Sequence, residues 1–350
     1  MQDFYRHRYK KMMLIPIIMA IPMLFLVILY PGISPGVDLT GGNVLMLQSQ
    51  KNITEVQLTA VLKENFNLPN LKVFTISSPT GFGARVEYSK DPVIASAEAA
   101  ISNASENIDD ENASIAFSNE ALKLLGQQPG QYTNSKTALL AAQTALAAQN
   151  DIFSKKLEDT IVQKLDLGEN AEFQTQEISP TLGAASFQSS ILVAILGVVF
   201  ITIVVFIAFR QLVPSGAIME AMLFDILAGL VGMAILRIPF SLTTLPALLL
   251  LIGYSIDTDI MLTSRMLKGK EGTRGERATE ALKTGITMTS TTMMALIVMI
   301  VVSYFYQIEV IYQISAILFF GLIGDIIATW LMNAPILLWF LERREAKRHF

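Results

Sequence analysis

The sequence predicts a polytopic α-helical membrane protein, with six transmembrane helices and an α+β ferredoxin-like extracytoplasmic domain inserted between the first and second helices. Three observations support this fold class. Hydrophobic residues make up 52% of the 350 residues and charged residues only 16%, which is typical of chains that spend much of their length in lipid. Six apolar runs are each long enough to cross a bilayer. Between the first and second runs, the composition changes to that of a soluble domain.

The first apolar run covers residues 12–30 and follows a basic N-terminus. We expect an uncleaved transmembrane helix rather than a signal peptide, because the run is long and no small-x-small cleavage site follows it. Pro16 and Pro22 are tolerated in such a helix as kinks. The remaining apolar runs cover residues 191–209, 213–236, 242–263, 282–304 and 311–340.

Residues 31–189 carry strand and helix patterns in turn. A capping box that starts at Thr54 predicts a helix through Phe66, and helical apolar spacing predicts another over residues 154–165. The predicted strands cover residues 43–48, 71–77, 85–89 and 172–178. The order strand-helix-strand-strand-helix-strand is that of a split ferredoxin-like fold. The segment 92–150, rich in Ala, Ser, Asn and Gln, predicts an insertion of surface helices with a weak core.

Basic residues predict the orientation in the membrane. They gather in the N-terminus, at Arg210, in the loop 265–277 and in the tail 343–348, all on one face of a six-span chain. Both termini are therefore expected to be cytoplasmic, in a multi-pass protein of the cell membrane. The predicted parts are an N-terminus and first helix over 1–30, an extracytoplasmic domain over 31–189, helices two to six over 190–340, and a basic cytoplasmic tail over 341–350.

The composition excludes several kinds of site. The chain has no cysteine, so it forms neither disulfides nor thiolate metal sites. His7 and His349 lie at opposite ends of the sequence, so neither a Ser-His-Asp triad nor a histidine-rich metal site is expected. A formal net charge of -4 with scattered basic residues argues against nucleic acid as a partner. We expect no catalytic residues, no metal and no cofactor.

Carboxylates inside the apolar runs are the first candidates for function. Asp225 lies in the third run, Asp257 and Asp259 in the fourth, and Asp325 in the sixth. A carboxylate at the centre of a transmembrane helix costs about 2.5–3.5 kcal/mol on insertion scales, so we expect at least one to be functional. The alternative is that they pair with polar groups on neighbouring helices and only hold the bundle together. Successive helical residues are about 100° apart, so Asp257 and Asp259 cannot face the same partner, and we expect Asp257 to face the interior.

The neighbours of these carboxylates favour close helix contacts. Small residues share a face with Asp225 and with Asp325, and small residues let helices approach each other in lipid. The fifth run adds a hydroxyl face of Thr284, Thr287 and Thr291, either as a proton relay or as packing with intrahelical hydrogen bonds. Lys283 opens that run, either as a cationic counterpart or with its ammonium at the interface. A carboxylate in a low-dielectric site takes up and releases protons near neutral pH.

Two motifs resemble those of the SecD/SecF protein-export family, in its SecF branch and within the RND superfamily. One follows the first apolar run and the other lies in the fourth. The residues that carry the resemblance are Asp38, Gly41, Gly42, Gly253, Tyr254 and Ser255. The order of one span, an outside domain and five spans is also that of the family, and Asp225 and Arg265 match family positions. The resemblance implies a non-enzymatic accessory subunit that acts with a SecD-like subunit and the SecYE translocon, and that uses the proton-motive force to export unfolded preproteins.

The sequence departs from the bacterial pattern of this family at two positions. Bacterial members carry Asn-Asp after Gly-Tyr-Ser-Ile, so their proton-carrying Asp falls on Thr258, between the carboxylates of Asp257 and Asp259. The fifth-span arginine of bacterial members is replaced by Thr284, next to Lys283. Both departures leave the proton pathway open. The Asp257-Thr258-Asp259 form and the insertion over residues 92–150 resemble archaeal SecF.

Three other functions remain as alternatives. Two membrane carboxylates on different helices suggest an intramembrane aspartyl protease, but the Gly-x-Gly-Asp spacing is wrong at Asp325 and no Tyr precedes Asp257. An RND-type exporter of small molecules or lipids normally has two six-span halves, whereas this chain has one. A non-conducting structural subunit of the translocon is favoured by the missing arginine.

Overall fold

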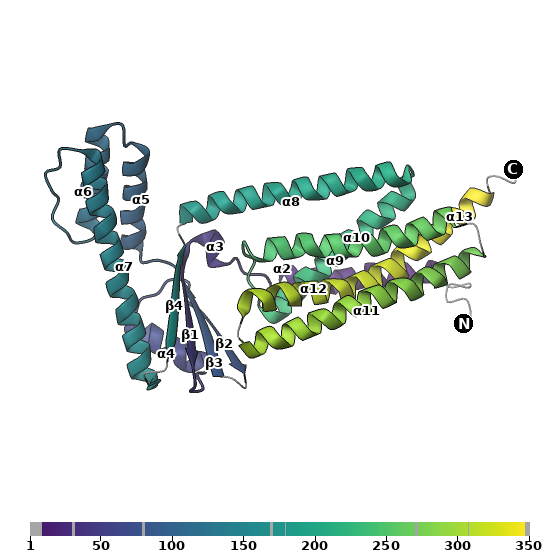
Figure 1. Ribbon diagram of the computed structural model, residues 1–350, viewed down its shortest axis with the longest axis horizontal. Coiled ribbons are helices and arrows are strands. Elements are labelled where there is room, and N and C mark those ends of the chain that lie inside the picture. The colour runs from purple at the N-terminus through teal and green to yellow at the C-terminus, as the bar shows by residue number, and fades with distance from the viewer. Residues whose placement is uncertain are drawn as a thin grey trace. The chain divides into compact units, whose positions relative to one another are not determined.

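A computed structural model describes residues 9–29, 32–78, 81–168, 171–178, 180–269, 272–306 and 308–346. The chain forms two compact units. One consists of Thr40–Gly183, and the other of Met1–Leu39 together with Ala184–Phe350. Figure 1 shows the helices and strands of both. We describe each unit by itself.

The prediction of six apolar spans is confirmed: the described residues contain six helical stretches that are long and apolar enough to cross a membrane. The first stretch joins α1 (Tyr9–Met12) to α2 (Leu14–Ile28), and α3 (Val37–Thr40) follows it. The others are α8 (Pro180–Phe209), α9 (Leu212–Leu236), α10 (Thr244–Lys268), α11 (Arg274–Tyr306) and α12 (Glu309–Ala328), which runs through the π-helical turn η1 (Thr329–Asn333) into α13 (Ala334–Ala346).

Helices α9, α10 and α12 form the interior of the bundle. More than half of each of these spans is buried, whereas only 6% of the spans of α2 and α8 is buried. Small residues allow the close approach, since a Cβ on Gly232 would lie 2.6 Å from the Phe320 ring and one on Gly324 would overlap Ala228. These glycines share a helix face with Asp225 and with Asp325. The two faces that pack closely are therefore also the faces that bring the carboxylates inside the bundle.

The unit Thr40–Gly183 contains one antiparallel sheet. Its strands are β1 (Gly42–Ser49), β2 (Lys72–Ser78), β3 (Gly81–Tyr88) and β4 (Glu172–Ile178), in the spatial order β2-β3-β1-β4. Helix α4 (Glu55–Asn65) begins with the predicted capping box of Thr54 and Gln57. Residues Leu45 and Leu47 of β1 pack in one core with Leu157 of α7 (Ser135–Leu165). The predicted order of strands and helices is therefore found.

The segment 92–150 differs from its prediction. It contains α5 (Pro92–Glu106), α6 (Glu111–Leu124) and the first half of α7. Instead of a weak core, fully buried Ala97, Ala121 and Ala142 pack in a compact cluster. The helix expected over residues 154–165 begins at Ser135, because no Gly or Pro interrupts the 31 residues of α7. One continuous helix thus joins the insertion to the core of the sheet.

Candidate functional site

Three carboxylates lie buried in the interior of the bundle. Asp225 comes from α9, Asp259 from α10 and Asp325 from α12, and each residue is 0% exposed. Ser255, one turn before Asp259 on α10, donates a hydrogen bond to Asp225 Oδ2. Neighbouring hydroxyl and small side chains on the same helix faces let the three helices meet at this point. We call Asp225, Asp259 and Asp325 the carboxylate cluster.

Thr329 links two members of the cluster. Its Oγ1 lies 2.9 Å from Asp259 Oδ1 and 3.1 Å from Asp325 Oδ1. A hydroxyl group has one proton to donate, so Thr329 donates to one carboxyl group and accepts from the other only when that group is protonated. The geometry therefore fits a state in which Asp259 and Asp325 hold one proton between them.

The π-helical turn Thr329–Asn333 brings a second side chain to the same carboxylate. Asn333 Nδ2 donates to Asp259 Oδ1 over 2.8 Å. π turns inside α-helices are frequent at functional sites, and this turn carries both residues that reach Asp259. Thr289 of α11 completes the surroundings, with its Oγ1 3.5 Å from Asp325 Oδ2.

Among the residues that the structure describes, no basic side chain pairs with the carboxylate cluster. Within the described ranges, the ion pairs found involve other carboxylates, in the sheet unit and near the end of α13. Arg265 is exposed and donates to Thr284 Oγ1 over 3.0 Å, and Lys283 is also exposed. In the same part of the chain, no group of three or more His, Cys, Asp or Glu side chains is arranged to hold a metal ion.

The expectation that Asp257 faces the interior is wrong. Asp257 is exposed, whereas Thr258 is 4% exposed and Asp259 is completely buried. Residues two positions apart in the sequence lie about 200° apart around a helix. The rotation that brings Ser255 and Asp259 inward therefore turns Asp257 outward. The i, i+4 spacing of Ser255 and Asp259 was the signal in the sequence that identifies the inner face.

Of the two roles expected for the hydroxyl face on the fifth span, the structure shows intrahelical hydrogen bonds and not a contact with the carboxylate cluster. Thr287 and Thr291 are exposed and donate to the backbone oxygens of Lys283 and Met288. Thr289, on a different face, is the α11 residue that reaches the cluster. Sequence reasoning also missed Thr329 and Asn333, because a π turn changes the helix face on which a residue lies and leaves no periodic signal.

The glycine motif at the start of β1 has a structural reason. Gly41 and Gly42 have φ of +74° and +146°, and a Cβ on Gly42 would meet the carbonyl oxygen of Tyr88. Both positions therefore need glycine. The motif residues Gly253 and Tyr254 lie on the exposed face of α10. The side chain of Asp38 and both histidines lie outside the described residues.

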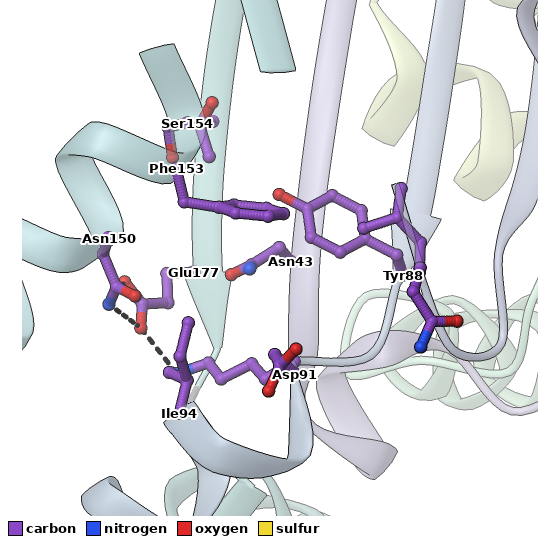
Figure 2. Close-up of a pocket in the computed structure, with 12 residues that line it drawn as sticks. Asn43, Tyr88, Asp91, Ile94, Asn150, Phe153, Ser154 and Glu177 are labelled. Carbon is purple, nitrogen blue, oxygen red and sulfur yellow. Dashed lines mark hydrogen bonds and ion pairs between the residues drawn. The ribbon is translucent and has the colours of Figure 1, made fainter. Parts of the chain in front are cut away.

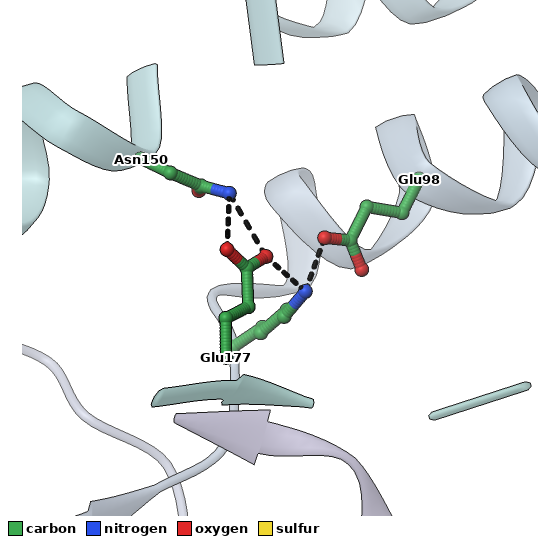
Figure 3. Close-up of polar contacts among 4 residues, drawn as sticks. Glu98, Asn150 and Glu177 are labelled. Atoms are coloured by element: carbon green, nitrogen blue, oxygen red, sulfur yellow. Dashed lines mark hydrogen bonds and ion pairs between the residues drawn. The ribbon is translucent and has the colours of Figure 1, made fainter. Parts of the chain in front are cut away.

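A second group of charged side chains lies in the sheet unit, where Figure 3 shows Glu98, Asn150 and Glu177 near one another. Its centre is Lys90, which follows β3 and is buried. Lys90 Nζ donates to Glu98 of α5 and, over 2.5 Å, to Glu177 of β4. Asn150 of α7 donates to both oxygens of Glu177, over 2.9 and 3.1 Å. Burial raises the pKa of the Glu98 carboxyl, against the lowering effect of Lys90. We call Lys90, Glu98, Glu177 and Asn150 the lysine cluster.

A pocket of about 40 Å³ adjoins the lysine cluster. Figure 2 shows Asn43, Tyr88 and Phe153 at its wall. The centres of the Tyr88 and Phe153 rings are 6.2 Å apart. Burial raises the pKa of Tyr88 to about 12, so its hydroxyl keeps its proton at neutral pH. Ligand pockets usually measure roughly 300–1,000 Å³, so this space suits a few water molecules and not an organic ligand.

Two solved structures have a fold similar to that of this chain. A crystal structure of SecDF from Thermus thermophilus aligns with 96% of this chain at a TM-score of 0.56 and 12% identity, and the chain spans 59% of that protein. A second SecDF structure, in a form called super-membrane-facing, aligns with 99% of the chain at a TM-score of 0.50 and 14% identity, and the chain spans 39% of it. At these identities, the likeness concerns the fold alone.

Sequence comparison identifies the family. The family described as "Protein export membrane protein SecD/SecF, C-terminal" matches residues 158–343. The protein-export membrane protein SecF of Methanothermobacter thermautotrophicus is 30% identical over 338 residues, which cover 96% of this chain and 94% of that one. SecF of Methanocaldococcus jannaschii is 39% identical over 200 residues, which cover 57% of this chain and 70% of that one. The resemblance read from the sequence motifs is thereby confirmed, and the chain belongs to the SecD/SecF family of protein-export membrane proteins.

Proposed function

We propose that this chain is the SecF subunit of an export complex in which proton movement through the carboxylate cluster drives the release of preproteins from the SecYE translocon. In this proposal the chain pairs with a SecD-like subunit in the cell membrane and keeps both termini in the cytoplasm. The sheet unit is a ferredoxin-like domain on the extracytoplasmic side, where it contacts unfolded preproteins. The chain acts by binding and movement, without an enzymatic step or a cofactor.

The observation that carries the proposal is the absence of a basic partner for the carboxylate cluster among the described residues. Like charges close together in a low-dielectric site disfavour each other's ionisation, and burial adds to this effect. The charge of the cluster is therefore set by the protons that it holds, and it changes when they leave. Thr329, between Asp259 and Asp325, provides a hydroxyl through which a proton passes from one carboxyl group to the other.

The cluster also couples protonation to helix position. Its three members belong to α9, α10 and α12, the interior helices. Loss of a proton places a charge between these helices, and the helices move apart or admit water to solvate it. One elementary charge moving across 100 mV releases about 2.3 kcal/mol, enough to shift an equilibrium between two helix arrangements by more than tenfold.

The outer face of α10 supports the pairing with a SecD-like subunit. Asp257, Gly253 and Tyr254 are exposed there, and a Cβ on Gly253 would meet nothing within 4 Å. An exposed carboxylate within a membrane span is costly in lipid, so a protein partner is expected to cover it. The solved SecDF chains extend well beyond the part that this chain matches, which leaves room for such a partner in the complex.

The experiment that tests the proposal is proton uptake by vesicles containing the chain and its companion subunit. An imposed pH gradient is expected to drive uptake that falls at least tenfold in Asp259→Asn. Asp257→Asn is the matched control, because it removes a carboxylate from the same helix but from the outer face. Equal uptake by wild type and Asp259→Asn would contradict the proposal, as would loss of uptake only in Asp257→Asn.

The role of the sheet unit is tested separately. A preprotein arrested during export is expected to crosslink to photoreactive residues in 31–189, with the insertion 92–150 as one set of positions and the sheet as another. Crosslinks at background level from both sets would remove preprotein contact from the proposal and leave proton uptake unaffected.

A further inference from the structure

We propose that Asn52, in the turn between β1 and α4, is a site of N-linked glycosylation. The modification attaches a glycan from a lipid-phosphate-linked oligosaccharide donor to the side-chain amide of this residue. The inference rests on the proposed function for one point, the extracytoplasmic side of the sheet unit, where oligosaccharyltransferases act. The choice of Asn52 is argued from the conformation and the exposure of the residues around it.

The sequence contains three acceptor motifs of the form Asn-x-Ser or Asn-x-Thr, and they begin at Asn52, Asn103 and Asn112, all in the sheet unit. Such a motif alone is a weak signal, because it needs only two residue types at a spacing of two. The structure distinguishes the three motifs. A transferase has to reach the Asn amide and the hydroxyl group of the same motif together.

The motif at Asn52 has an extended backbone. Residues 52–54 belong to neither a helix nor a strand, and Thr54 has φ of -90° and ψ of 148°. Successive side chains of an extended segment point to opposite sides. Ile53, in the middle, is 4% exposed and packs in the core of the sheet unit. Asn52 and Thr54 therefore lie on the same outer side, and both are exposed.

Both groups of this motif are accessible. The side chain of Asn52 makes no hydrogen bond to any residue that the structure describes. The Thr54 hydroxyl takes part in the capping box with Gln57 at the surface of the unit. Water competes for hydrogen bonds at such an exposed position, so a transferase can replace this partner without unfolding α4.

The position of Asn52 leaves room for a glycan. The sheet unit begins just before β1 and ends just after β4, and Gly42 of β1 pairs with Ile178 of β4 at that end of the sheet. Asn52 follows the other end of β1, which is roughly 25 Å along the strand at about 3.3 Å per residue. A glycan on Asn52 therefore obstructs neither connection of the unit to the rest of the chain.

The other two motifs are helical. Asn103 lies in the last turn of α5 and Asn112 in the first turn of α6. Residues two positions apart lie about 200° apart around a helix, so the amide and the hydroxyl of each motif point to opposite sides. In the motif of Asn112, Ser114 is 0% exposed and donates to Ala104 O over 2.8 Å. One enzyme site cannot bind both groups of either motif in the folded unit.

The transfer forms one bond and breaks one. Asn52 Nδ2 bonds to the anomeric carbon of the glycan, and the bond from that carbon to the phosphate oxygen of the donor breaks. The lipid phosphate leaves with the electron pair of the broken bond, and the amide loses one proton to the leaving phosphate. Neither an oxidant nor a reductant is needed. The transferase supplies the catalysis, and this chain supplies only the acceptor.

The test is mass spectrometry of peptides from the full chain, produced with its companion subunit in two hosts that differ only in a functional oligosaccharyltransferase. In the competent host, the peptide with Asn52 is expected to carry a glycan at least tenfold more often than those with Asn103 and Asn112. The deficient host and Asn52→Gln are expected to give no glycan on this peptide. A bare Asn52 in the competent host, or equal modification of the helical motifs, would overturn the proposal.

Two substitutions at Thr54 separate the motif from the helix cap. Thr54→Asp keeps a good N-cap residue for α4 but removes the hydroxyl of the motif, so we expect the glycan to be lost at least tenfold. Thr54→Ser keeps both functions and is expected to keep the glycan. Equal glycan on the wild type and Thr54→Asp would contradict recognition of this motif and overturn the proposal.

A cysteine reporter distinguishes failure of this inference from failure of the proposed orientation. The chain has no cysteine, and Lys123 is exposed on α6. Lys123→Cys on intact cells is expected to react with a membrane-impermeant maleimide. Labelling together with a bare Asn52 would overturn the glycosylation and leave the orientation standing. Absence of labelling would overturn the orientation, and the glycosylation with it.

Discussion

The lysine cluster and the carboxylate cluster differ in one respect, the presence of a cation. In the lysine cluster, Glu98 and Glu177 share the ammonium group of Lys90, which is itself 8% exposed. In the carboxylate cluster, Asp225, Asp259 and Asp325 share only hydroxyl and amide groups.

The difference shows what each cluster is suited to do. An ammonium group stabilises the charged form of a carboxylate beside it, and removing either partner leaves the other uncompensated. The lysine cluster therefore has a structural role: its contacts hold β4, α5 and α7 to the turn after β3. The carboxylate cluster has no such cation among the described residues, so its charge is set by the protons that it gains and loses.

The largest expected effect tests the carboxylate cluster as a whole. Replacing Asp225, Asp259 and Asp325 together by Asn keeps their shape and removes every titratable proton. We expect proton uptake to fall to background while the stability of the bundle changes by no more than about 1 kcal/mol, because amides replace protonated carboxyl groups of the same size. Thermal unfolding in detergent and uptake by vesicles are the two measurements. Unfolding of this variant would mean that the bundle needs the charges.

The next largest effect tests the lysine cluster. Lys90→Met leaves Glu98 and Glu177 close together without a cation, and breaking a buried ion pair costs about 3–5 kcal/mol. Because the Glu177 side chain is 41% exposed, we expect a loss near the lower limit, about 3 kcal/mol. Protection of α5 and α7 against proteolysis measures it. Lys90→Met is expected to keep its proton uptake at temperatures where the sheet unit is still folded. Loss of uptake at those temperatures would mean that the lysine cluster also takes part in proton movement.

A smaller effect concerns pH. Because burial raises the pKa of Glu98 above its ordinary value of 4.5, the folded unit holds this proton at pH values where the unfolded chain has released it. The stability from this group is fully present below pH 4.5 and is lost as the pH rises through the folded pKa.

Glu98→Gln is therefore expected to flatten the decline of stability with rising pH. One proton sets the limit of the change at about 1.4 kcal/mol per pH unit. Thermal unfolding between about pH 4 and pH 8 measures the slope. Glu106→Gln, exposed on the same helix, is the control and should leave the slope unchanged. A steeper slope in Glu98→Gln would reverse the sign that we assign to this group.

The sequence predicted the six spans and the strand order because both depend on patterns of apolar residues over many positions. It also identified Asp225 and Asp325, since a carboxylate in an apolar run stands out whatever its orientation. It did not identify which of Asp257 and Asp259 is buried, because that depends on the rotation of α10 against α9 and α12.

The lysine cluster was missed for a different reason. Glu98, Asn150 and Glu177 come from three elements that are far apart in the sequence, and Lys90 lies between β3 and α5, eight residues before Glu98. Each is a common surface residue, and only the packing of the insertion against the sheet brings them together. Thr329 and Asn333 were missed because of the π turn, which no residue pattern announces.

The smallest effect comes from an ion pair at the surface. Lys51 pairs with Asp166 over 3.3 Å, and their side chains are 50% and 95% exposed. Its Nζ also donates to the carbonyl oxygens of Leu165 and Asp166 at the end of α7, over 2.8 and 2.9 Å. Exposed pairs contribute about 0–1 kcal/mol, and a cation at a helix C-terminus adds a similar amount. Lys51→Met is expected to cost about 1 kcal/mol in thermal unfolding, a third of the loss in Lys90→Met. Equal losses in the two variants would mean that burial does not distinguish these ammonium groups, and the contrast between the lysine cluster and the carboxylate cluster would then lose its physical basis.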